Sequence, residues 1–331
     1  MHTLCPDKIK MIKRNACAST VWRQAVVFLS MLTMATAATL EFAASVPTAG
    51  NAGFEAFRLP SAGGGDDDVY LAAANFWDGA SANMSARSTV FKVKASKSTA
   101  EPPREDSLVL SRMQSMRTRG AHGWDFFRTT HGDRLLVVPN YYGCGSKRGP
   151  ATGDCTSTIV YRWRDDKGKF VRTQSLRTAG PGQTDHFTVG EDTYLLVGEN
   201  FDDKVSIWKD VRRKNRPHFQ KLQELDGISG AGAMAMCRVD ADTLLLVAAA
   251  YHSGTKESGW TTNSPVFQWS SSTNLGFIEV PVQWIEGHGT HDVECASFQG
   301  RHYLFLSEDR DNDGSKIRSK VMLYDADKSQ Y

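Results

Sequence analysis

Two stretches, Thr118-Arg-Gly-Ala-His-Gly-Trp-Asp125-Phe-Phe127 and Thr178-Ala-Gly-Pro-Gly-Gln-Thr-Asp185-His-Phe187, share one frame of threonine, glycine, acid and phenylalanine. In both copies an asparagine, Asn140 or Asn200, follows thirteen residues after the last phenylalanine and closes an apolar run. A unit that recurs along a chain indicates a repeat architecture. This repeat therefore decides the fold.

Each copy continues into short apolar runs that are typical of β-strands. The first copy has Leu135–Val138, Ile159–Trp163 and Val171–Leu176, and the second has Tyr194–Val197, Val205–Trp208 and Phe219–Leu222. Three weaker copies contain Val69–Asn75 and Thr89–Val93, then Leu244–Val247 and Val266–Trp269, then Tyr303–Leu306 and Val321–Tyr324. The whole chain beyond the N-terminal region is therefore built from one unit.

About five copies of a four-stranded unit predict an all-β protein, a β-propeller with four-stranded blades. One such sheet leaves both faces exposed, so the blades must pack around an axis to bury their apolar rows. The segment Leu40–Val46 precedes the first Thr-x-Gly turn, where other copies have an outer strand. We expect it to complete the last blade and remove an exposed edge. The alternative is a part of a larger ring.

The N-terminal region differs from the repeats. A basic stretch with one acid, Asp7, precedes the uncharged apolar run Ala25–Leu40, which contains Ala35-Thr-Ala37, a small-x-small pattern. This order predicts a signal peptide over residues 1–37, followed by a propeller domain over residues 38–331. The protein is then secreted. An uncleaved signal anchor, which would make it a type II membrane protein, is the alternative.

Composition and charge exclude two classes of protein. Apolar residues make up 40% and charged residues 23% of the 331 residues, which favours a packed core over disorder. Removing residues 1–37 takes away five bases and one acid, so the net charge changes from +2 to −2. A nucleic-acid binder normally has a strong basic surplus. The one basic cluster, Arg212-Arg-Lys-Asn-Arg216, is expected to be a solvated loop.

The cysteines and one sequon are consistent with export. Cys144 and Cys155 bracket a loop with glycine and proline, which predicts a local disulfide. Cys237 and Cys295 could pair or remain buried thiols, and the sequence leaves both open. Asn83-Met-Ser85 is an N-glycosylation sequon.

Acidic residues recur two positions before the phenylalanine position of the repeat: Glu55, Asp125, Asp185 and Glu294. On the innermost strands they would line the axial channel. Clustered carboxylates repel each other unless a cation neutralises them, so a channel Ca²⁺ held by Asp125, Asp185 and Glu294 is one hypothesis. A solvated channel without a metal is the other.

A second calcium hypothesis concerns Asp309-Arg-Asp311-Asn-Asp313-Gly314, in which alternating acids precede a glycine. Asp292, on the neighbouring strand of the same copy, could add a ligand. The segment is not an EF-hand, because Lys320 stands where that motif needs a glutamate. An Asp-rich turn that binds nothing is the alternative.

Other motifs give weaker indications. Glu286-Gly-His-Gly-Thr-His-Asp292 holds metal-ligand residue types on a predicted flexible loop, but without the helical spacing of a catalytic zinc site. Tryptophans recur at one blade position and are expected in the core: Trp163, Trp208 and Trp269. Aromatic residues follow the asparagine position and should share one face of the ring, as a binding surface or as packing under loops: Phe76, Trp77, Tyr141, Tyr142, Phe201 and Tyr251.

The repeat resembles the epilepsy-associated repeat, also called EAR or EPTP. The resemblance rests on Gln174-Ser-Leu-Arg-Thr178, Asp185-His-Phe187, Tyr194–Val197, Asn200 and Ile159–Trp163, and Asp292-Val-Glu294 is similar to the family's inner strands. It covers residues 40–331 approximately. It implies a secreted β-propeller used for extracellular protein recognition, and it points to calcium at Asp125 and Asp185.

The sequence thus predicts an extracellular protein-interaction propeller, for adhesion or receptor binding, whose partner is an extracellular or cell-surface protein. Contact with a membrane is expected only if the N-terminal segment stays uncleaved. The protein is not expected to be an enzyme. The alternative is a five-bladed carbohydrate-binding or glycoside-processing ring, with the channel acids as sugar contacts. A third possibility is a purely structural surface protein without a specific ligand.

Overall fold

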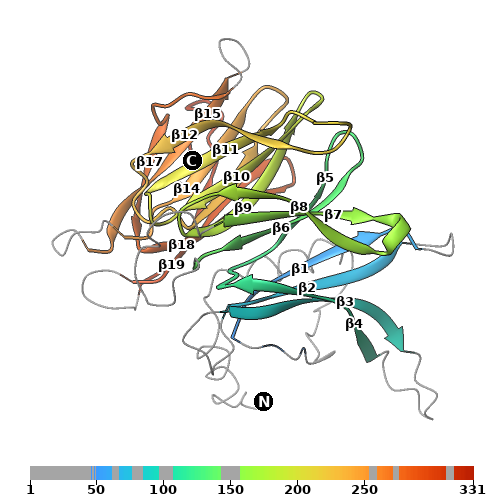
Figure 1. Cartoon of the computed structure of the whole chain (residues 1–331). Coiled ribbons are helices and arrows are strands. Elements are labelled where there is room, and N and C mark those ends of the chain that lie inside the picture. Colours follow the sequence, from blue (N-terminus) through green and yellow to red (C-terminus); the bar gives the residue numbers. More distant parts are fainter. Residues whose placement is uncertain are drawn as a thin grey trace, which may run out of the picture.

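The structure, a computed structural model, describes residues 46, 48, 50–61, 67–76, 85–96, 107–142, 157–252, 259–270, 276–310 and 317–331. In these ranges twenty strands form five antiparallel sheets (Figure 1). The predicted all-β propeller with four-stranded blades is confirmed. The predictions for residues 1–37 and 40–45, and for Trp77, Asn83, Cys144, Cys155, Asp311 and Asp313, fall outside the described residues.

The five sheets are consecutive in the chain. Blade I contains β1 (Asn51–Leu59), β2 (Asp68–Asn75), β3 (Ser85–Ser96) and β4 (Ser107–Arg119). Blade II contains β5 (Asp125–Arg128), β6 (Arg134–Asn140), β7 (Ser157–Arg164) and β8 (Lys169–Arg177), with a short 3-10 helix over Asp165–Lys167. Blade III contains β9 (Pro181–Val189), β10 (Asp192–Glu199), β11 (Lys204–Asp210) and β12 (Phe219–Asp226).

The last two blades depart from this plan. Blade IV contains β13 (Ala233–Arg238), β14 (Leu244–Ala249), β15 (Thr261–Ser270), β16 (Gly276–Phe277) and β17 (Gln283–His288), and both β16 and β17 pair with β15. Blade V contains β18 (Thr290–Phe298), β19 (Arg301–Glu308) and β20 (Lys320–Leu323). The outer strand of blade IV is thus split in two, and blade V has three strands among the described residues.

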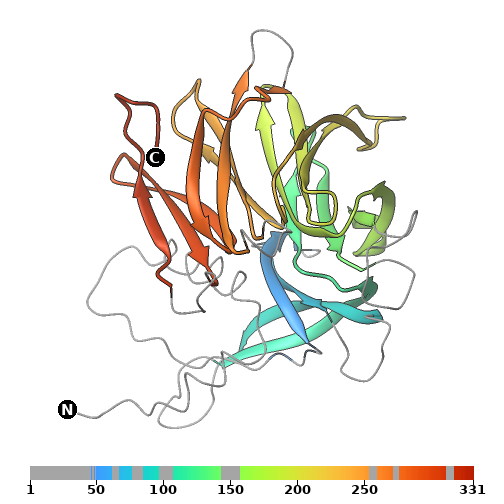
Figure 2. The same cartoon turned by 90° about the vertical axis from the view of Figure 1, so that its left-hand side faces the viewer.

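The blades follow one another around a shared centre, from blue to red in Figure 2. The inner strands meet there, since β1 contacts β5, β5 contacts β9, β9 contacts β13 and β13 contacts β18. Each apolar cluster draws on two consecutive blades. Between blades II and III, for example, Phe127 and Val137 pack with Leu195 and Trp208. Burying such side chains contributes about 1.5–3 kcal/mol each, so the blades are stable only as neighbours.

The tryptophans confirm their predicted place in the core. Trp163, Trp208 and Trp269 are 9%, 8% and 6% exposed, each on the third strand of its blade. In the part of the chain that the structure describes, no helix is long and apolar enough to cross a membrane.

A glutamine on the outer strand of each of blades I to IV bonds to the backbone of the next blade. Gln174 of β8 donates to the Phe219 carbonyl at 2.7 Å and accepts from the Phe219 amide at 2.8 Å. The same pair of bonds joins Gln114 to Phe170, Gln223 to Phe277 and Gln283 to Tyr331. Next to Gln114, Gln174 and Gln223 a β-bulge shifts the strand register, and a bulge can re-aim a side chain. These glutamine clamps set the spacing of the blades.

The question left open about two cysteines is settled by the fold. Cys237 of β13 and Cys295 of β18 form a disulfide, with Cα atoms 5.5 Å apart. It links the inner strands of blades IV and V.

Candidate functional site: the axial cavity

The Thr-x-Gly turn carries the chain from the outer strand of one blade to the inner strand of the next. Gly120 and Gly180 take φ values of 57° and 56°, which favour glycine. A Cβ there would lie 2.7 Å from Cδ2 of Tyr142 and 2.4 Å from Cδ2 of Phe201 respectively. Each glycine therefore leaves room for an aromatic ring that follows the second strand of its blade.

These rings gather at one end of the axis, as predicted for the residues after the asparagine position. Ring centroids lie 4.9 Å apart for Phe76 and His122, 4.8 Å for His122 and Tyr141, 5.1 Å for Tyr141 and Tyr142, and 4.8 Å for Tyr141 and Phe201. We call this group the first arc, and it comes from blades I to III. The Tyr141 hydroxyl donates to Oδ1 of Asn200 at 2.9 Å, which fixes the central ring.

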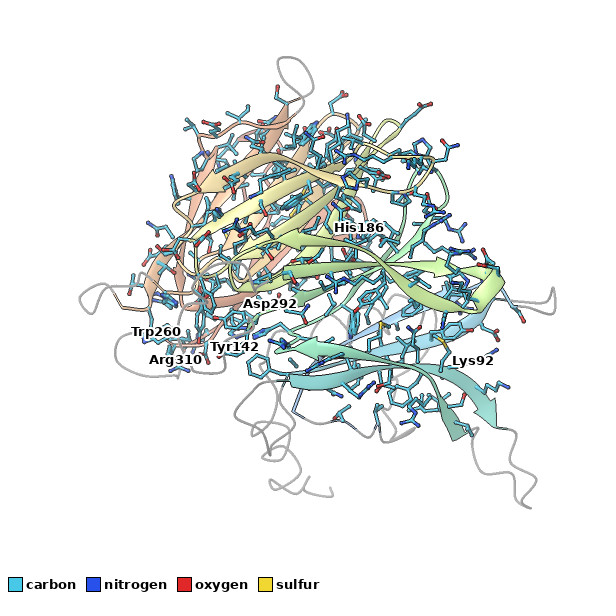
Figure 3. The ribbon with its side chains drawn as sticks, in the orientation of Figure 1. Lys92, Tyr142, His186, Trp260, Asp292 and Arg310 are labelled. Carbon is cyan, nitrogen blue, oxygen red and sulfur yellow. A yellow bond between two sulfur atoms is a disulfide. The ribbon has the colours of Figure 1, made fainter. Side chains whose placement is uncertain are left out.

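A second arc comes from blades IV and V. Tyr251 lies 5.1 Å from Trp260 and 5.2 Å from His291, centroid to centroid. Its hydroxyl donates to Oδ2 of Asp309 at 3.2 Å, and the Arg310 guanidinium covers Trp260 at 4.7 Å. Figure 3 shows Tyr142, Trp260 and Arg310 at the same end of the molecule. The two arcs form the mouth of the axial cavity.

The axial cavity has a volume of about 260 Å³ and is lined by all five blades. The first arc contributes Phe76, His122, Tyr141 and Tyr142 to its lining, and the second arc contributes Tyr251 and His291. Its walls also include Phe54, Glu55, Trp124, Gln183, Thr184, Gly232, Thr290 and Asp292. Two of the lining residues are acids, Glu55 and Asp292, and no described lysine or arginine lines it. The Asp292 residue is only 4% exposed. A cavity with aromatic walls and buried acidic charge attracts cationic groups.

Two histidines of the mouth do not offset this charge. Burial, and then the nearby His291, lowers the pKa of His122 to about 4. Burial also lowers the pKa of His291, although Asp309 acts in the opposite direction. Both imidazoles are therefore neutral at pH 7 and add no positive charge to the mouth.

Several polar atoms of the cavity wall have no partner among the described residues. They are the indole Nε1 of Trp124 and the hydroxyls of Thr184 and Thr290, and these residues are 4%, 2% and 1% exposed. A buried polar group without a hydrogen bond costs about 1–3 kcal/mol, so native proteins keep few of them. The wall is thus able to bond to a polar ligand or to water.

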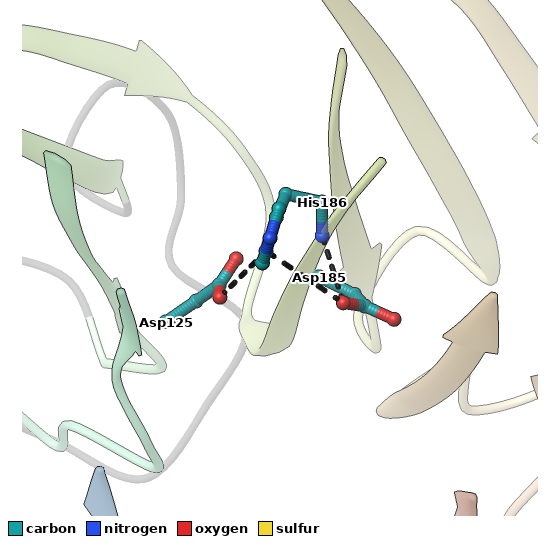
Figure 4. Close-up of side chains that lie close together, drawn as sticks. All are labelled: Asp125, Asp185 and His186. Carbon is teal, nitrogen blue, oxygen red and sulfur yellow. Dashed lines mark hydrogen bonds and ion pairs between the residues drawn. The ribbon is translucent and has the colours of Figure 1, made fainter. Parts of the chain in front are cut away.

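On the neighbouring inner strands β5 and β9, Asp125 and Asp185 lie on either side of His186 (Figure 4). Nδ1 of His186 donates to Oδ1 of Asp125 at 2.9 Å, and its ring stacks on Phe127 at 4.4 Å. Asp185 accepts from its neighbour's backbone amide at 2.8 Å and from the amide of Met236 at 3.2 Å. One ligand atom from each of the three residues lies within 4.8 Å of the others, so the group could hold a metal ion.

The electrostatics of this group favour a positive charge at its centre. Burial lowers the pKa of His186, but the neighbouring carboxylates, Asp125 first, outweigh burial and raise that pKa to about 9. The imidazolium therefore neutralises part of the carboxylate charge at pH 7. Oδ2 of Asp125 is buried and has no partner in the described part of the chain.

The remaining predicted metal ligands lie outside this group. Glu294 lies on β18 opposite Phe305, and Asp292 lines the cavity. Asp309 pairs with Arg310 at 2.8 Å. Within the described ranges, none of these three acids belongs to a group of three potential ligands. The proposed ligand set of the Asp309 turn therefore stays a prediction.

One sequence interpretation was wrong. Residues 286–292 are not a flexible loop, because Glu286–His288 ends β17 and Thr290–Asp292 begins β18. Strand pairing places His291 in the cavity wall. His122, His186 and Trp260 also belong to the site, and no pattern in the sequence had pointed to them.

Comparisons with known proteins give a distant relative. No family model matches the sequence. Over 136 residues, 40% of the chain, the sequence is 29% identical to a Mus musculus protein named thrombospondin-type laminin G domain and EAR repeat-containing protein. The matching stretch spans only 17% of that protein.

Solved structures with a similar arrangement share little sequence. A GH43_1 enzyme from Xanthomonas citri gives a TM-score of 0.42 at 11% identity, over 85% of this chain and 90% of that one. RS223-β-xylosidase gives 0.41 at 14% identity, over 80% and 91%. These similarities contribute nothing to the description of the site, which rests on the contacts within this chain.

Proposed function

We propose that the chain is an extracellular, EAR-type propeller that binds a protein partner through the mouth of its axial cavity, and that it is not an enzyme. The observation that carries this is the cavity itself, in which two aromatic arcs surround a wall that contains two acids and, among the described residues, no lysine or arginine. Aromatic residues that enclose a pocket are the usual anchors of protein interfaces. The EAR resemblance and the 29% identical relative support the assignment.

The partner should insert a basic side chain. A lysine or arginine side chain places its apolar stem against the rings and its charge near Glu55 and Asp292. The disulfide between Cys237 and Cys295 supports an oxidising, extracellular location, since disulfides are rare in the cytosol.

A peptide-display selection on the purified protein tests this function. We expect enriched peptides with a lysine or arginine beside an aromatic residue, and loss of their binding in Asp292→Asn. The matched control is Trp284→Ala, which removes an aromatic side chain that is 54% exposed and does not line the cavity. Enriched peptides that bind Asp292→Asn as well as the wild type would contradict the proposed mouth.

Glycoside processing is the second candidate, because Glu55 and Asp292 line one cavity and glycosidases use paired carboxylates. A screen of aryl glycosides and glycans distinguishes the two functions. Turnover that is abolished by both Glu55→Gln and Asp292→Asn would replace the binding function with a catalytic one.

We further propose that calcium stabilises the channel through Asp125 and Asp185. The spare, buried Oδ2 of Asp125 fits a cation, and carboxylate oxygens suit Ca²⁺. The imidazole of His186 suits transition metals better, and its charge competes with any cation for the same carboxylates. Calorimetric titration of Ca²⁺ into the wild type and the Asp125→Ala/Asp185→Ala variant tests this. Identical titrations would end the hypothesis.

A further inference from the structure

The basic run Arg212–Arg216 is solvent-exposed from Arg213 to Arg216, as the sequence predicts, and it also contacts a neighbouring blade. It follows β11 and lies against the outer strands of blade II. Together they enclose a second cavity of about 280 Å³. Its lining contains five arginines, Arg162, Arg164, Arg172, Arg213 and Arg216, with Val171, Thr173, Pro217 and His218. We call this cavity the arginine pocket.

The loop that supplies two of these arginines is rigidly built. The Arg213 amide donates to the Arg216 carbonyl at 2.9 Å, and the Arg216 amide donates back at 3.0 Å. Lys214 and Asn215 between them have φ values of 51° and 57°. Positive φ at both central residues defines a type I′ turn, which holds its flanking residues in register. Arg213 and Arg216 therefore face the pocket from a fixed hairpin.

A buried acid anchors this hairpin to blade II. Nη1 of Arg212 donates to Oδ2 of Asp133 at 2.8 Å, and Nη2 donates to the Asn215 carbonyl at 2.8 Å. The other oxygen of Asp133 pairs with Nε of Arg162 at 2.7 Å. The side chain of Asp133 is only 5% exposed. One carboxylate thus joins the hairpin after β11 to strand β7, and the pocket is formed before any ligand arrives.

The charges of the pocket are unbalanced. Asp133 compensates Arg162, and Asp166 binds Arg164 through two hydrogen bonds of 2.8 and 2.7 Å. In the described ranges, Arg172, Arg213 and Arg216 form no ion pair, and no acid lines the pocket. Three guanidinium groups therefore face one small cavity without a counter-charge. Arg172, Arg213 and Arg216 are solvent-exposed, so water screens their mutual repulsion, and an oxyanion bound between them would be attracted by all three groups.

We propose that the arginine pocket binds the sulfate groups of an acidic extracellular polysaccharide, which rests on the extracellular location proposed above. Guanidinium groups bind the oxygens of sulfate and phosphate in pairs, so several arginines suit a ligand with clustered oxyanions. The described part of the lining holds no phenylalanine, tyrosine or tryptophan, so it offers no stacking platform for nucleic-acid bases. The predicted mature chain is close to neutral, which also disfavours nucleic acid.

Binding of a heparin-derived oligosaccharide to the full chain tests the proposal. The measurement is isothermal titration at salt concentrations between about 50 and 200 mM, in parallel with the same oligosaccharide after chemical desulfation. We expect binding that depends on sulfate and weakens with salt. In Arg213→Gln/Arg216→Gln the affinity should fall about 10- to 100-fold, and the slope of log K against log salt should fall by about two.

Two controls separate the pocket from general charge and from the axial cavity. Arg301→Gln/Arg318→Gln removes the same charge from exposed positions on blade V and should change the affinity less than about 2-fold. Tyr141→Ala alters only the cavity mouth and should leave oligosaccharide binding unchanged, so either proposal can fail alone. Three results would overturn the proposal. They are equal binding of the desulfated oligosaccharide, an equal loss of affinity in the two double-arginine variants, and tighter binding of single-stranded DNA at the same salt concentration.

Discussion

If the glutamine clamps hold neighbouring blades together, removing one should lower the free energy of unfolding. Gln174→Leu tests this most clearly. Leucine keeps roughly the volume of glutamine but cannot bond to the backbone of Phe219. That residue is 1% exposed, so its amide and carbonyl would lose their partners without gaining water. Each buried backbone group left unpaired costs about 1–3 kcal/mol. We therefore expect the free energy of unfolding to fall by about 2–4 kcal/mol.

Thermal and urea unfolding measure this loss. For a domain of this size a change of 1 kcal/mol shifts Tm by roughly 2 °C, so Gln174→Leu should melt about 4–8 °C below the wild type. Gln220→Leu makes the same replacement at an exposed position of β12 and should melt close to the wild type. If Gln174→Leu melts within about 1 °C of that control, the clamps do not hold the blades together.

Three further predictions concern the turns, the disulfide and the cavity mouth. In Gly180→Ala the new Cβ would overlap the Phe201 ring, so the free energy of unfolding should fall by about 2–4 kcal/mol. Gly190→Ala is the control: its φ of 58° is also positive but no atom lies near the new Cβ, so the loss should be only about 1 kcal/mol. Equal losses in urea would show that the ring contact is unimportant. Replacing both Cys237 and Cys295 by alanine should remove about 2–4 kcal/mol and abolish the effect of reductant on Tm; a reductant effect that persists would place the functional disulfide elsewhere. The neutral state of His122, with its pKa near 4, means that the unfolded chain binds a proton between about pH 6.5 and 4 while the folded chain does not, so stability should fall by about 1–2 kcal/mol from pH 7 to 5. His122→Phe should reduce that slope, and an unchanged slope would assign the acid sensitivity to another group.

Much of the fold follows from the repeat in the sequence. The apolar runs correspond to the strands of the five sheets, and the Thr-x-Gly frame marks the turns between blades. The outer strands were harder to predict because they bury fewer side chains. β12, for example, exposes most of its first half. β16 and β17 escaped prediction because the outer strand of blade IV is interrupted by residues 278–282.

The pairing of Asp125 with His186 could have been predicted from the sequence by considering which face of each inner strand a residue occupies. Neighbouring residues of a strand point to opposite faces, so in a ring His186 must face the preceding blade while Asp185 faces the following one. Asp125 points from that preceding blade toward blade III. The pairing of Asp125 with His186 thus follows from strand alternation plus the order of the blades.

The same reasoning explains the disulfide. Cys237 occupies the repeat position of Phe127, and Cys295 occupies that of His186. In blades II and III these positions bring two rings into stacking contact, and in blades IV and V they bring two sulfur atoms together. The arginine pocket, in contrast, depends on how a hairpin from one blade lies against another. No periodicity within a single repeat contains that information.

The central claim is that the mouth of the axial cavity is where this propeller recognises a partner. Its most direct test is the dissociation constant of a display-selected peptide, measured by calorimetry for the wild type, Asp292→Asn and Arg301→Gln. We predict that Asp292→Asn weakens binding about 10-fold or more, because truncating a buried charge contact costs more than about 1.4 kcal/mol, while Arg301→Gln leaves the constant unchanged. Equal constants for all three proteins would contradict the claim.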